Sequence, residues 1–487
     1  MAAERRAPST QYMMTHQKAR LDVSTAVETS AEVGKMTLPL GEALAARAAR
    51  GAPLRVGLIG AGKFGTMFLS QALRLPDLHV VGVADLSGTR AAEALARAGW
   101  PRERYAARSS QEALRTGGTW ITDDPQALIS GDGLDVVVEA TGVPEAGIAH
   151  ALRAFEFRRH VVMVNVEADA LAGPLLARRA AAAGVVYTLA YGDQPALICE
   201  LVEWARACGF DVVCAGKGTK YLPIYHASTP QTVWDYYGFS PETVAAGGLN
   251  AQMFNSFLDG TKSAIEMAAV SNATGLEPQD AGLRFPPCGI HDLASVCRPA
   301  HQGGTLSRDG TVEVVSSLER DGRKIQDDLR WGVYVTFRAH SDYVARCFAE
   351  YGLVTDDSGR YTAMYRPYHL VGLEVVVSVL RAGLRGEATG TPRAFHADVA
   401  ATAKRGLAEG EILDGEGGYC VYGTLMPAAR AIALGALPIG LAHRVRLRQA
   451  VPAGQVVRWE DVDLEETPAV RFRREMVASA LSDGGMC

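Results

Sequence analysis

Residues 55–65 read Arg-Val-Gly-Leu-Ile-Gly-Ala-Gly-Lys-Phe-Gly (RVGLIGAGKFG), and this stretch decides the fold. Its first half is a short run of branched apolar side chains, which is typical of a strand buried on both faces. Three glycines follow, and then the apolar residues recur at helical spacing. Such glycines allow a tight turn, close approach of the backbone to a diphosphate, and close packing of helix on strand. The stretch therefore predicts the first strand, turn and helix of a dinucleotide-binding sheet.

The turn predicts the residues that contact the cofactor diphosphate, which are Gly60, Gly62, Lys63, Phe64 and Gly65. A second apolar run, residues 79–84, ends in Asp85, where a carboxylate is placed to accept hydrogen bonds from a ribose diol. The charge of Asp85 favours NAD, because it would repel a 2′-phosphate. Ser87, Thr89 and Arg90 follow at once and are able to hold that phosphate, so the sequence leaves NAD and NADP open.

Length and composition limit the classes of protein. The chain has 487 residues, of which 48% are hydrophobic and 21% charged, with a net charge of −5. These values predict a globular protein of two or three domains, and they give no support for binding to nucleic acid or to an anionic membrane. No apolar run is long enough to span a bilayer. Eight cysteines without a CxxC pair indicate reduced thiols and a cytoplasmic protein.

Strand and helix patterns alternate from residue 55 to about 192, which predicts an α/β fold with a Rossmann-type parallel sheet. Ligands of such sheets lie at the carboxyl ends of the strands. Thr141 and Gly142 follow one predicted strand and Asn165 follows the next. We therefore expect these three residues, with Asp85, to line the cofactor site.

The chain divides into four predicted segments. Residues 1–38 form a loosely ordered extension, 39–192 the NAD(P)-binding domain, 193–396 an α+β substrate domain, and 397–487 a β-rich unit with a tail. The last segment contains an internal echo, in which 407–413 matches 451–457. Each copy predicts a strand–turn–strand element with a glycine at the turn.

A predicted long helix over residues 251–269 carries the strongest catalytic candidates. Asn255, Asp259, Lys262 and Glu266 fall on one face of it, between apolar flanks. A lysine held there beside a carboxylate can donate a proton or stabilise an oxyanion while hydride reaches a carbonyl carbon. The alternative is an exposed stripe of helix ion pairs.

Other polar residues are candidates for substrate or metal binding. Lys217 and Lys220 lie in a glycine-rich turn after the strand 210–215 and are predicted to clamp a phosphate or carboxylate, the alternative being two solvated lysines. Oxygen ligands for Mg²⁺ or Mn²⁺ are available on a further set of carboxylates at the cleft: Asp193, Glu200, Asp259 and Glu266.

Three segments resemble homoserine dehydrogenase in order and spacing. They are residues 139–142 (EATG), 160–165 (HVVMVN) and 215–222 (AGKGTKYL). The lysine that follows the asparagine in that family is replaced here by Val166 and Glu167, and the asparagine-rich loop carries lysines instead. The resemblance implies a similar architecture with a different substrate.

A broader resemblance, over about residues 40–465, is to the 1-deoxy-D-xylulose 5-phosphate reductoisomerase-like family. It rests on VGLIGAGKFGTMFLSQ, MFNSFLDGTKSAIEMAAVSNATGL, RPYHLVGLE and LDGEGGYCVYG through LPIGLAH. The last segment, about 400–465, also resembles the SAF (β-clip) domain. The family resemblance implies NADPH as cofactor, with NADH possible, a divalent cation, and reductive isomerisation giving 2-C-methyl-D-erythritol 4-phosphate.

These observations predict an NAD(P)-dependent oxidoreductase acting on a small, phosphorylated carbonyl substrate, which we expect to be a homo-oligomer. A reductase of an amino-acid semialdehyde, similar to homoserine dehydrogenase, is the second hypothesis. The third is a non-catalytic nucleotide-responsive protein that binds a sugar or a partner through its C-terminal unit.

Overall fold

The computed structural model describes residues 38–482, so almost all of the predicted N-terminal extension lies outside the described residues. Its largest sheet has six parallel strands in the order β3-β2-β1-β4-β5-β6. The strands are β1 (Leu54–Ile59), β2 (Leu78–Ala84), β3 (Trp120–Thr122), β4 (Val136–Glu139), β5 (His160–Met163) and β6 (Tyr187–Leu189). This is the strand order of the Rossmann fold, in which cofactors lie where the order reverses, beside β1 and β4. The predicted fold class is confirmed.

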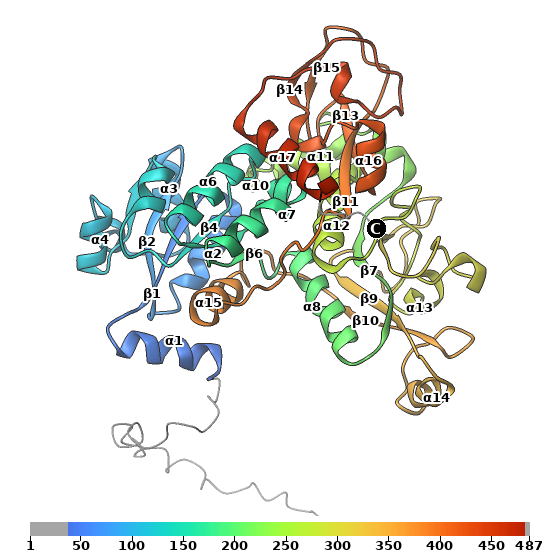
Figure 1. The fold of residues 1–487 in the computed structure, drawn as a ribbon, viewed down its shortest axis with the longest axis horizontal. Helices are drawn as coiled ribbons and strands as arrows, with labels where there is room; N and C mark the ends of the chain where they lie inside the picture. Colours follow the sequence, from blue (N-terminus) through green and yellow to red (C-terminus); the bar gives the residue numbers. More distant parts are fainter. Residues whose placement is uncertain (1–37, 483–487) are drawn as a thin grey trace, which may run out of the picture.

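Helices cover both faces of this sheet (Figure 1). They are α1 (Leu40–Ala49), α2 (Lys63–Ala72), α3 (Gly88–Arg97), α4 (Ser110–Thr116), α5 (Pro125–Ser130), α6 (Pro144–Glu156) and α7 (Val166–Ala182). A later helix, α15 (Val376–Arg385), also packs on this sheet although it lies in the predicted substrate segment. Buried strands with near-continuous Val, Leu and Ile suit a sheet covered on both sides.

A second sheet of four strands, in the order β10-β9-β7-β8, forms the next part of the chain. Its strands are β7 (Asp211–Thr219), β8 (Thr311–Ser316), β9 (Val333–Arg338) and β10 (Tyr361–Arg366). The associated helices are α8 (Gln194–Ala207), α9 (Val233–Tyr237), α10 (Pro241–Gly247), α13 (Leu293–Val296) and α14 (Asp342–Glu350). The predicted strands near 311 and 331 are confirmed. Lys217 lies within β7 and not in a turn after it, because that strand continues to Thr219.

The predicted single helix over 251–269 is wrong. The chain forms α11 (Ala251–Leu258) and α12 (Thr261–Thr274), separated at Asp259 and Gly260. Gly260 has φ +89°, a left-handed conformation that only glycine adopts readily, and it redirects the chain. The four polar residues therefore do not form one stripe, and each half of the pattern meets different partners.

The C-terminal part contains two small sheets and two helices. They comprise β11 (Ala397–Ala403), β12 (Ile412–Asp414), β13 (Val421–Pro427), β14 (His443–Leu447), β15 (Val462–Asp463), α16 (Ala428–Leu434) and α17 (Pro468–Ser482). Both echo glycines, Gly410 and Gly454, have positive φ, as turns require. The two echo copies pair with each other through Leu407 and Val451.

Helix α12 lies where the three parts meet (Figure 1). It contacts α7 of the nucleotide-binding part, α8 and β8 of the second part, and β11 and β13 of the C-terminal part. Nearly all of its side chains are buried. Polar groups at its first turns are therefore held among all three parts. Within residues 38–482, no helix has the length and apolar character needed to cross a membrane.

Candidate active site

The turn between β1 and α2 has the geometry that a bound diphosphate requires. Gly60 has φ +98°, and a Cβ there would lie 2.5 Å from the carbonyl oxygen of Ala140. A Cβ on Gly65 would lie 2.4 Å from the oxygen of Gly60, so helix and turn touch directly. At Gly62 a Cβ would meet nothing within 4 Å, and no side chain caps α2. The open space therefore faces unpaired amides at a helix N-terminus, which suits a diphosphate.

Asp85 supports this turn from the end of β2. Its carboxylate accepts hydrogen bonds from the amides of Ala61 (2.8 Å) and Ser87 (2.9 Å) and from Nε of Arg90 (2.9 Å). Burial raises the pKa of Asp85, but the hydrogen bonds from Arg90 and the two amides lower it more, so the net pKa lies below its ordinary value. The carboxylate is thus ionised and neutralised by Arg90, whose side chain is still 55% exposed.

The strand ends beside β4 and β5 form a hydrogen-bonded unit. Thr141 donates to Oε1 of the buried Glu139 (2.6 Å). The Asn165 amide donates to Thr141 (3.2 Å) and to the carbonyl of Val143 (2.9 Å), and its oxygen caps α7. Gly142 has φ +67°. The structure thus brings together Thr141, Gly142 and Asn165, as predicted, at the edge where a nicotinamide lies in this fold.

Glu167 extends this edge towards α12. It lies in the first turn of α7, two residues after Asn165, and its carboxylate pairs with the ammonium of Lys262. Both side chains are mostly buried, at 13% and 16% exposure. Burial alone would lower the pKa of Lys262, but Glu167, Glu416, Glu266 and Asp193 together raise it well above its ordinary value. Lys262 is therefore a fixed positive charge beside the nicotinamide edge.

Two further lysines are paired in the same region. Lys217 of β7 pairs with Glu266 of α12, and both side chains are buried. The interpretation of Asp259 as a catalytic partner of Lys262 is corrected by its surroundings. Asp259 is fully buried, pairs with Lys404 at 2.7 Å, and accepts a hydrogen bond from the Thr261 amide (2.9 Å). It connects the start of α12 to the C-terminal part.

Two carboxyls near Lys262 remain without a cation of their own. Burial and the charge of Glu266 raise the pKa of Asp193 to about 7, although Lys262 opposes this. Burial and Glu167 raise the pKa of Glu416 to about 8, again against Lys262. Within residues 38–482, neither group forms an ion pair. In both groups burial therefore favours the protonated carboxyl over the carboxylate, which suits a group that donates a proton.

Lys220 lies apart from Lys217. Lys217 lies inside β7, whereas Lys220 follows the end of that strand at Thr219. The Lys220 ammonium donates to the carbonyl of Tyr236 and lies 5.4 Å from the ring of Tyr237. Burial and the charges of Arg330 and Lys324 lower its pKa. The predicted clamp of two adjacent lysines is not formed, and Lys220 belongs to a second cationic group with Arg330 and Lys324.

The predicted metal ligands do not form a site of three or more ligands within residues 38–482. Glu200 accepts a hydrogen bond from Tyr191 (2.6 Å), Glu266 pairs with Lys217, and Asp193 caps α8. No group of three or more His, Cys, Asp or Glu side chains in the described chain has the arrangement of a metal site. The geometry therefore does not fit the divalent cation that the sequence suggested, because each of these oxygens is engaged elsewhere.

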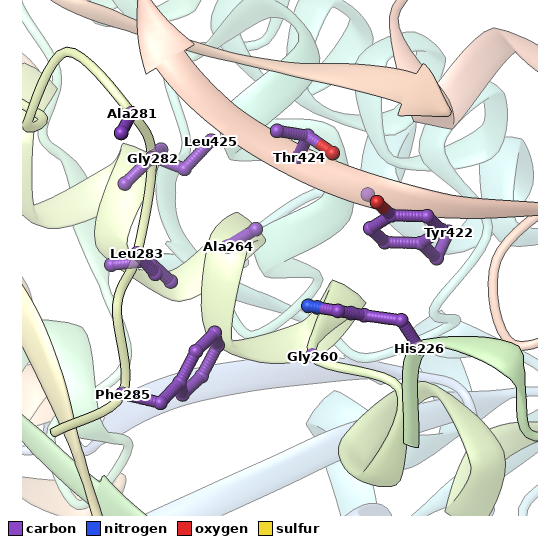
Figure 2. A pocket seen from close by; sticks show the side chains of 11 residues that line it. His226, Gly260, Ala264, Ala281, Gly282, Leu283, Phe285, Tyr422, Thr424 and Leu425 are labelled. Atoms are coloured by element: carbon purple, nitrogen blue, oxygen red, sulfur yellow. The ribbon is translucent and has the colours of Figure 1, made fainter. Parts of the chain in front are cut away.

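A cavity of about 110 Å³ lies on the other side of Gly260 (Figure 2). Its wall includes Phe285, Tyr422 and His226. Both nitrogens of His226 are satisfied, by the Asp259 carbonyl (2.7 Å) and by Tyr221 (2.8 Å). Burial is the main cause that lowers the pKa of His226. The residues that line the cavity include no free charged group. We therefore assign the acid–base chemistry to the charged groups around Lys262. This Lys262 cluster consists of Asp193, Glu167, Lys217, Asp259, Lys262, Glu266, Lys404 and Glu416.

Sequence reasoning missed three members of this cluster: Glu167, Lys404 and Glu416. In the sequence, Glu167 is notable only because it stands near the place of the lysine that homoserine dehydrogenases have. The signal for Glu416 was its place in a run with three glycines, residues 415–418, which indicates a tightly packed loop.

Residues 192–375 match the family model described as "Oxidoreductase DRL, catalytic domain". No curated protein matches the chain. Among solved structures, a probable dehydrogenase from Thermotoga maritima is 13% identical, with a TM-score of 0.34 over 69% of this chain and 90% of that one.

Two other solved structures belong to the families named above. A homoserine dehydrogenase from Thiobacillus denitrificans is 17% identical, with a TM-score of 0.38 over 68% of this chain and 73% of that one. A 1-deoxy-D-xylulose 5-phosphate reductoisomerase from Zymomonas mobilis, in complex with NADPH, is 17% identical, with a TM-score of 0.31 over 45% and 57%. Likeness at this level carries no information about the substrate of this chain.

The Rossmann sheet, the glycine turn and the match to an oxidoreductase catalytic domain define the class. The chain is an NAD(P)-dependent oxidoreductase, as the sequence predicted.

Proposed function

We propose that this protein reduces the carbonyl group of a small anionic substrate, with Lys262 stabilising the developing oxyanion. NAD(P)H, when bound, supplies the hydride. The observation that carries the proposal is the ion pair of Lys262 with Glu167, two residues beyond Asn165. A fixed ammonium in a site of low polarity stabilises a negative oxygen without reorganisation. Glu167 orients that ammonium at the nicotinamide edge.

The second cationic group supports an anionic substrate. Lys220, Arg330 and Lys324 oppose one another electrostatically, and no carboxylate pairs with them within residues 38–482. His369 lies near both this group and the Lys217–Glu266 pair. Its Nδ1 contacts the carbonyl of Trp331, the neighbour of Arg330, at 2.7 Å. Burial lowers its pKa, and the charges of Lys217 and Glu266 also affect this pKa. A phosphate or carboxylate of the substrate would supply the missing negative charge.

The finer hypothesis is reductive isomerisation of 1-deoxy-D-xylulose 5-phosphate. It rests on the family resemblance of the sequence and on this cationic group, whereas the metal geometry does not favour it. Reduction of an amino-acid semialdehyde is the alternative, and the resemblance of residues 139–142, 160–165 and 215–222 to homoserine dehydrogenase supports it.

The test is NADPH oxidation, followed at the nicotinamide absorbance, on a panel of ketose phosphates, aldose phosphates and amino-acid semialdehydes. Each substrate is run with NADH as well, and with added Mn²⁺ or with chelator. We expect turnover of a phosphorylated carbonyl compound that Lys262→Met slows about 10²- to 10³-fold. Turnover of unphosphorylated semialdehydes alone would establish the alternative. No turnover on any member, by protein that binds NADPH, would contradict the proposal.

A further inference from the structure

The loop between β12 and β13 carries a C-terminal residue into the Lys262 cluster. Gly415 and Gly417 flank Glu416 and have φ +76° and +66°. A Cβ on Gly417 would lie 2.1 Å from the carbonyl oxygen of Gln252, so the loop packs directly on α11. The glycines therefore permit a contact that no other residue would allow.

Side chains from other elements fix this loop in place. The Gln252 amide donates to the carbonyl oxygens of Asp414 (3.1 Å) and Glu416 (2.9 Å). Asn255 donates to the carbonyl of Gly417 (2.9 Å), and the Lys404 ammonium donates to that of Gly418 (2.7 Å). These four hydrogen bonds, to the carbonyls of residues 414, 416, 417 and 418, leave the Glu416 backbone little freedom. Its side chain is thus presented to the cluster by a rigid support.

Charge pairing leaves Glu416, like Asp193, as a carboxyl near Lys262 without a cation of its own. The ammonium of Lys262 pairs with Glu167, and that of Lys404 pairs with Asp259. Glu416 contacts the side chain of Ser256 and is exposed to the charges of Glu167, Lys262 and Asp259. One ammonium cannot neutralise two neighbouring carboxylates, so one carboxyl keeps its proton.

We propose that Glu416 is a further catalytic residue, the acid that protonates the substrate oxygen while Lys262 stabilises its negative charge. The C-terminal part would then complete the active site. The inference rests on the proposed reductase function. The carbonyl carbon accepts a hydride from the reduced nicotinamide, and the carbonyl π pair moves to oxygen. That oxygen takes the proton of the Glu416 carboxyl, whose carboxylate regains a proton from water before the next cycle.

The electrostatics favour Glu416 over Lys262 as the proton donor. Burial and Glu167 raise the pKa of the Glu416 carboxyl to about 8, whereas the pKa of Lys262 is raised far above the operating range. A donor is most efficient when its pKa lies near the working pH. Asp193, with a pKa of about 7, faces the same ammonium from α8, but its Oδ1 already accepts the Gln194 amide (3.0 Å) and caps that helix. Asp193 is therefore the alternative proton donor, and the experiment must distinguish its effect from that of Glu416.

The experiment compares wild type, Glu416→Gln, Glu416→Asp and Asp193→Asn, with Glu409→Gln as a matched control. Glu409 is an exposed glutamate of the same C-terminal part and lies outside the cluster. Carboxyl ¹³C NMR of glutamate-labelled protein follows titration between about pH 5 and about pH 10. The pH profile of kcat/KM is measured with the carbonyl compound that the wild type reduces best. Far-UV circular dichroism and NADPH binding verify folding.

We expect a glutamate signal with a midpoint near 8 that is absent from Glu416→Gln only, beside the signal of Glu313, whose pKa burial raises to about 7. Reduction by the wild type should fall as pH rises through that midpoint, because the acid is then deprotonated. Glu416→Gln should lose about 10²-fold in kcat/KM, and its pH profile should lack this fall at high pH, the alkaline limb of the profile. Glu416→Asp should restore the alkaline limb, and Glu409→Gln should match the wild type.

Two kinds of result would overturn the assignment. If the wild type turns over but Glu416→Gln keeps its rate and its pH profile, or only Asp193→Asn loses the limb, Glu416 is not the acid. A missing glutamate titration near 8 has the same consequence. If the wild type reduces no carbonyl compound, the proposed function fails, and the catalytic role of Glu416 fails with it.

Discussion

Lys262 and Glu167, 95 residues apart in the sequence, form an ion pair that joins the first turn of α12 to the first turn of α7. Asn165 caps α7, so the pair is fixed to the carboxyl end of β5, where we expect the nicotinamide to lie. The residue two positions after Asn165 is thus a carboxylate that pairs with a lysine from another part of the chain.

Removal of this charge should affect the chemical step and not cofactor binding. We expect Lys262→Met to lower kcat about 10²- to 10³-fold, as loss of one oxyanion-stabilising group does, with NADPH affinity within about twofold of wild type. Lys262→Arg should retain part of the activity, because a guanidinium also pairs with Glu167. Steady-state kinetics and calorimetric titration with NADPH provide the two readouts. Equal activity of Lys262→Met and wild type would exclude the assigned role.

Arg90 should determine how strongly the protein prefers NADPH, which carries a 2′-phosphate, over NADH. It neutralises Asp85 and is still 55% exposed, so its free edge is available to a 2′-phosphate. We expect Arg90→Ala to weaken NADPH binding about tenfold, a change of about 1.4 kcal/mol, and to leave NADH within about twofold. Calorimetric titrations with both cofactors measure this difference. Arg97→Ala, an exposed arginine at the other end of α3, is the control. A parallel loss for both cofactors would indicate a role in the turn alone.

The sequence predicted the nucleotide-binding part well because its signals are local. Gly60, Asp85 and Asn165 each follow a buried strand, and parallel strands bring such positions to one edge. The pairing of charges was not predictable in the same way. A helical stripe of Asn255, Asp259, Lys262 and Glu266 assumes an unbroken helix, and the positive φ of Gly260 divides it.

The partners of the cluster also come from distant parts of the chain. Lys404 and Glu416 meet α11 and α12 only when the C-terminal part has packed on them. Neither pairing has a spacing that a sequence pattern reveals, because the contacts form between elements about 145 residues or more apart. Long-range packing, and not local propensity, decides which carboxylate receives which lysine.

Asp169 should make the stability of the protein depend on pH. It is fully buried in α7, accepts a hydrogen bond from Tyr187 (2.9 Å), and burial raises its pKa to about 7. The folded state therefore binds this proton more tightly than the unfolded chain, so the contribution to stability is present at low pH and is lost as pH rises towards 7.

The measurement is urea unfolding of wild type and Asp169→Asn at about pH 5 and about pH 8. The free energy of unfolding of the wild type, relative to the variant, should fall by about 3 kcal/mol between these conditions, because each pKa unit corresponds to about 1.4 kcal/mol. The asparagine keeps the shape and an acceptor for Tyr187 but does not titrate. A pH-independent difference between the two proteins would show that Asp169 keeps one protonation state throughout.

Lys404 and Asp259 should contribute to stability as a unit and not as independent charges. Both side chains are at most 2% exposed, and Lys404 also donates to the carbonyls of Ser228 and Gly418 (both 2.7 Å). Lys404→Met leaves a buried carboxylate without its cation, so we expect a loss of about 3–5 kcal/mol in the free energy of unfolding. Lys404→Met combined with Asp259→Leu removes both charges, and it should be less destabilised than the sum of the single variants.

Glu156→Gln, at the exposed pair with Arg153, should cost less than about 1 kcal/mol. Urea denaturation of the wild type, the two single variants, the double variant and Glu156→Gln measures the coupling, and additive losses would mean that the two charges do not interact in the folded protein.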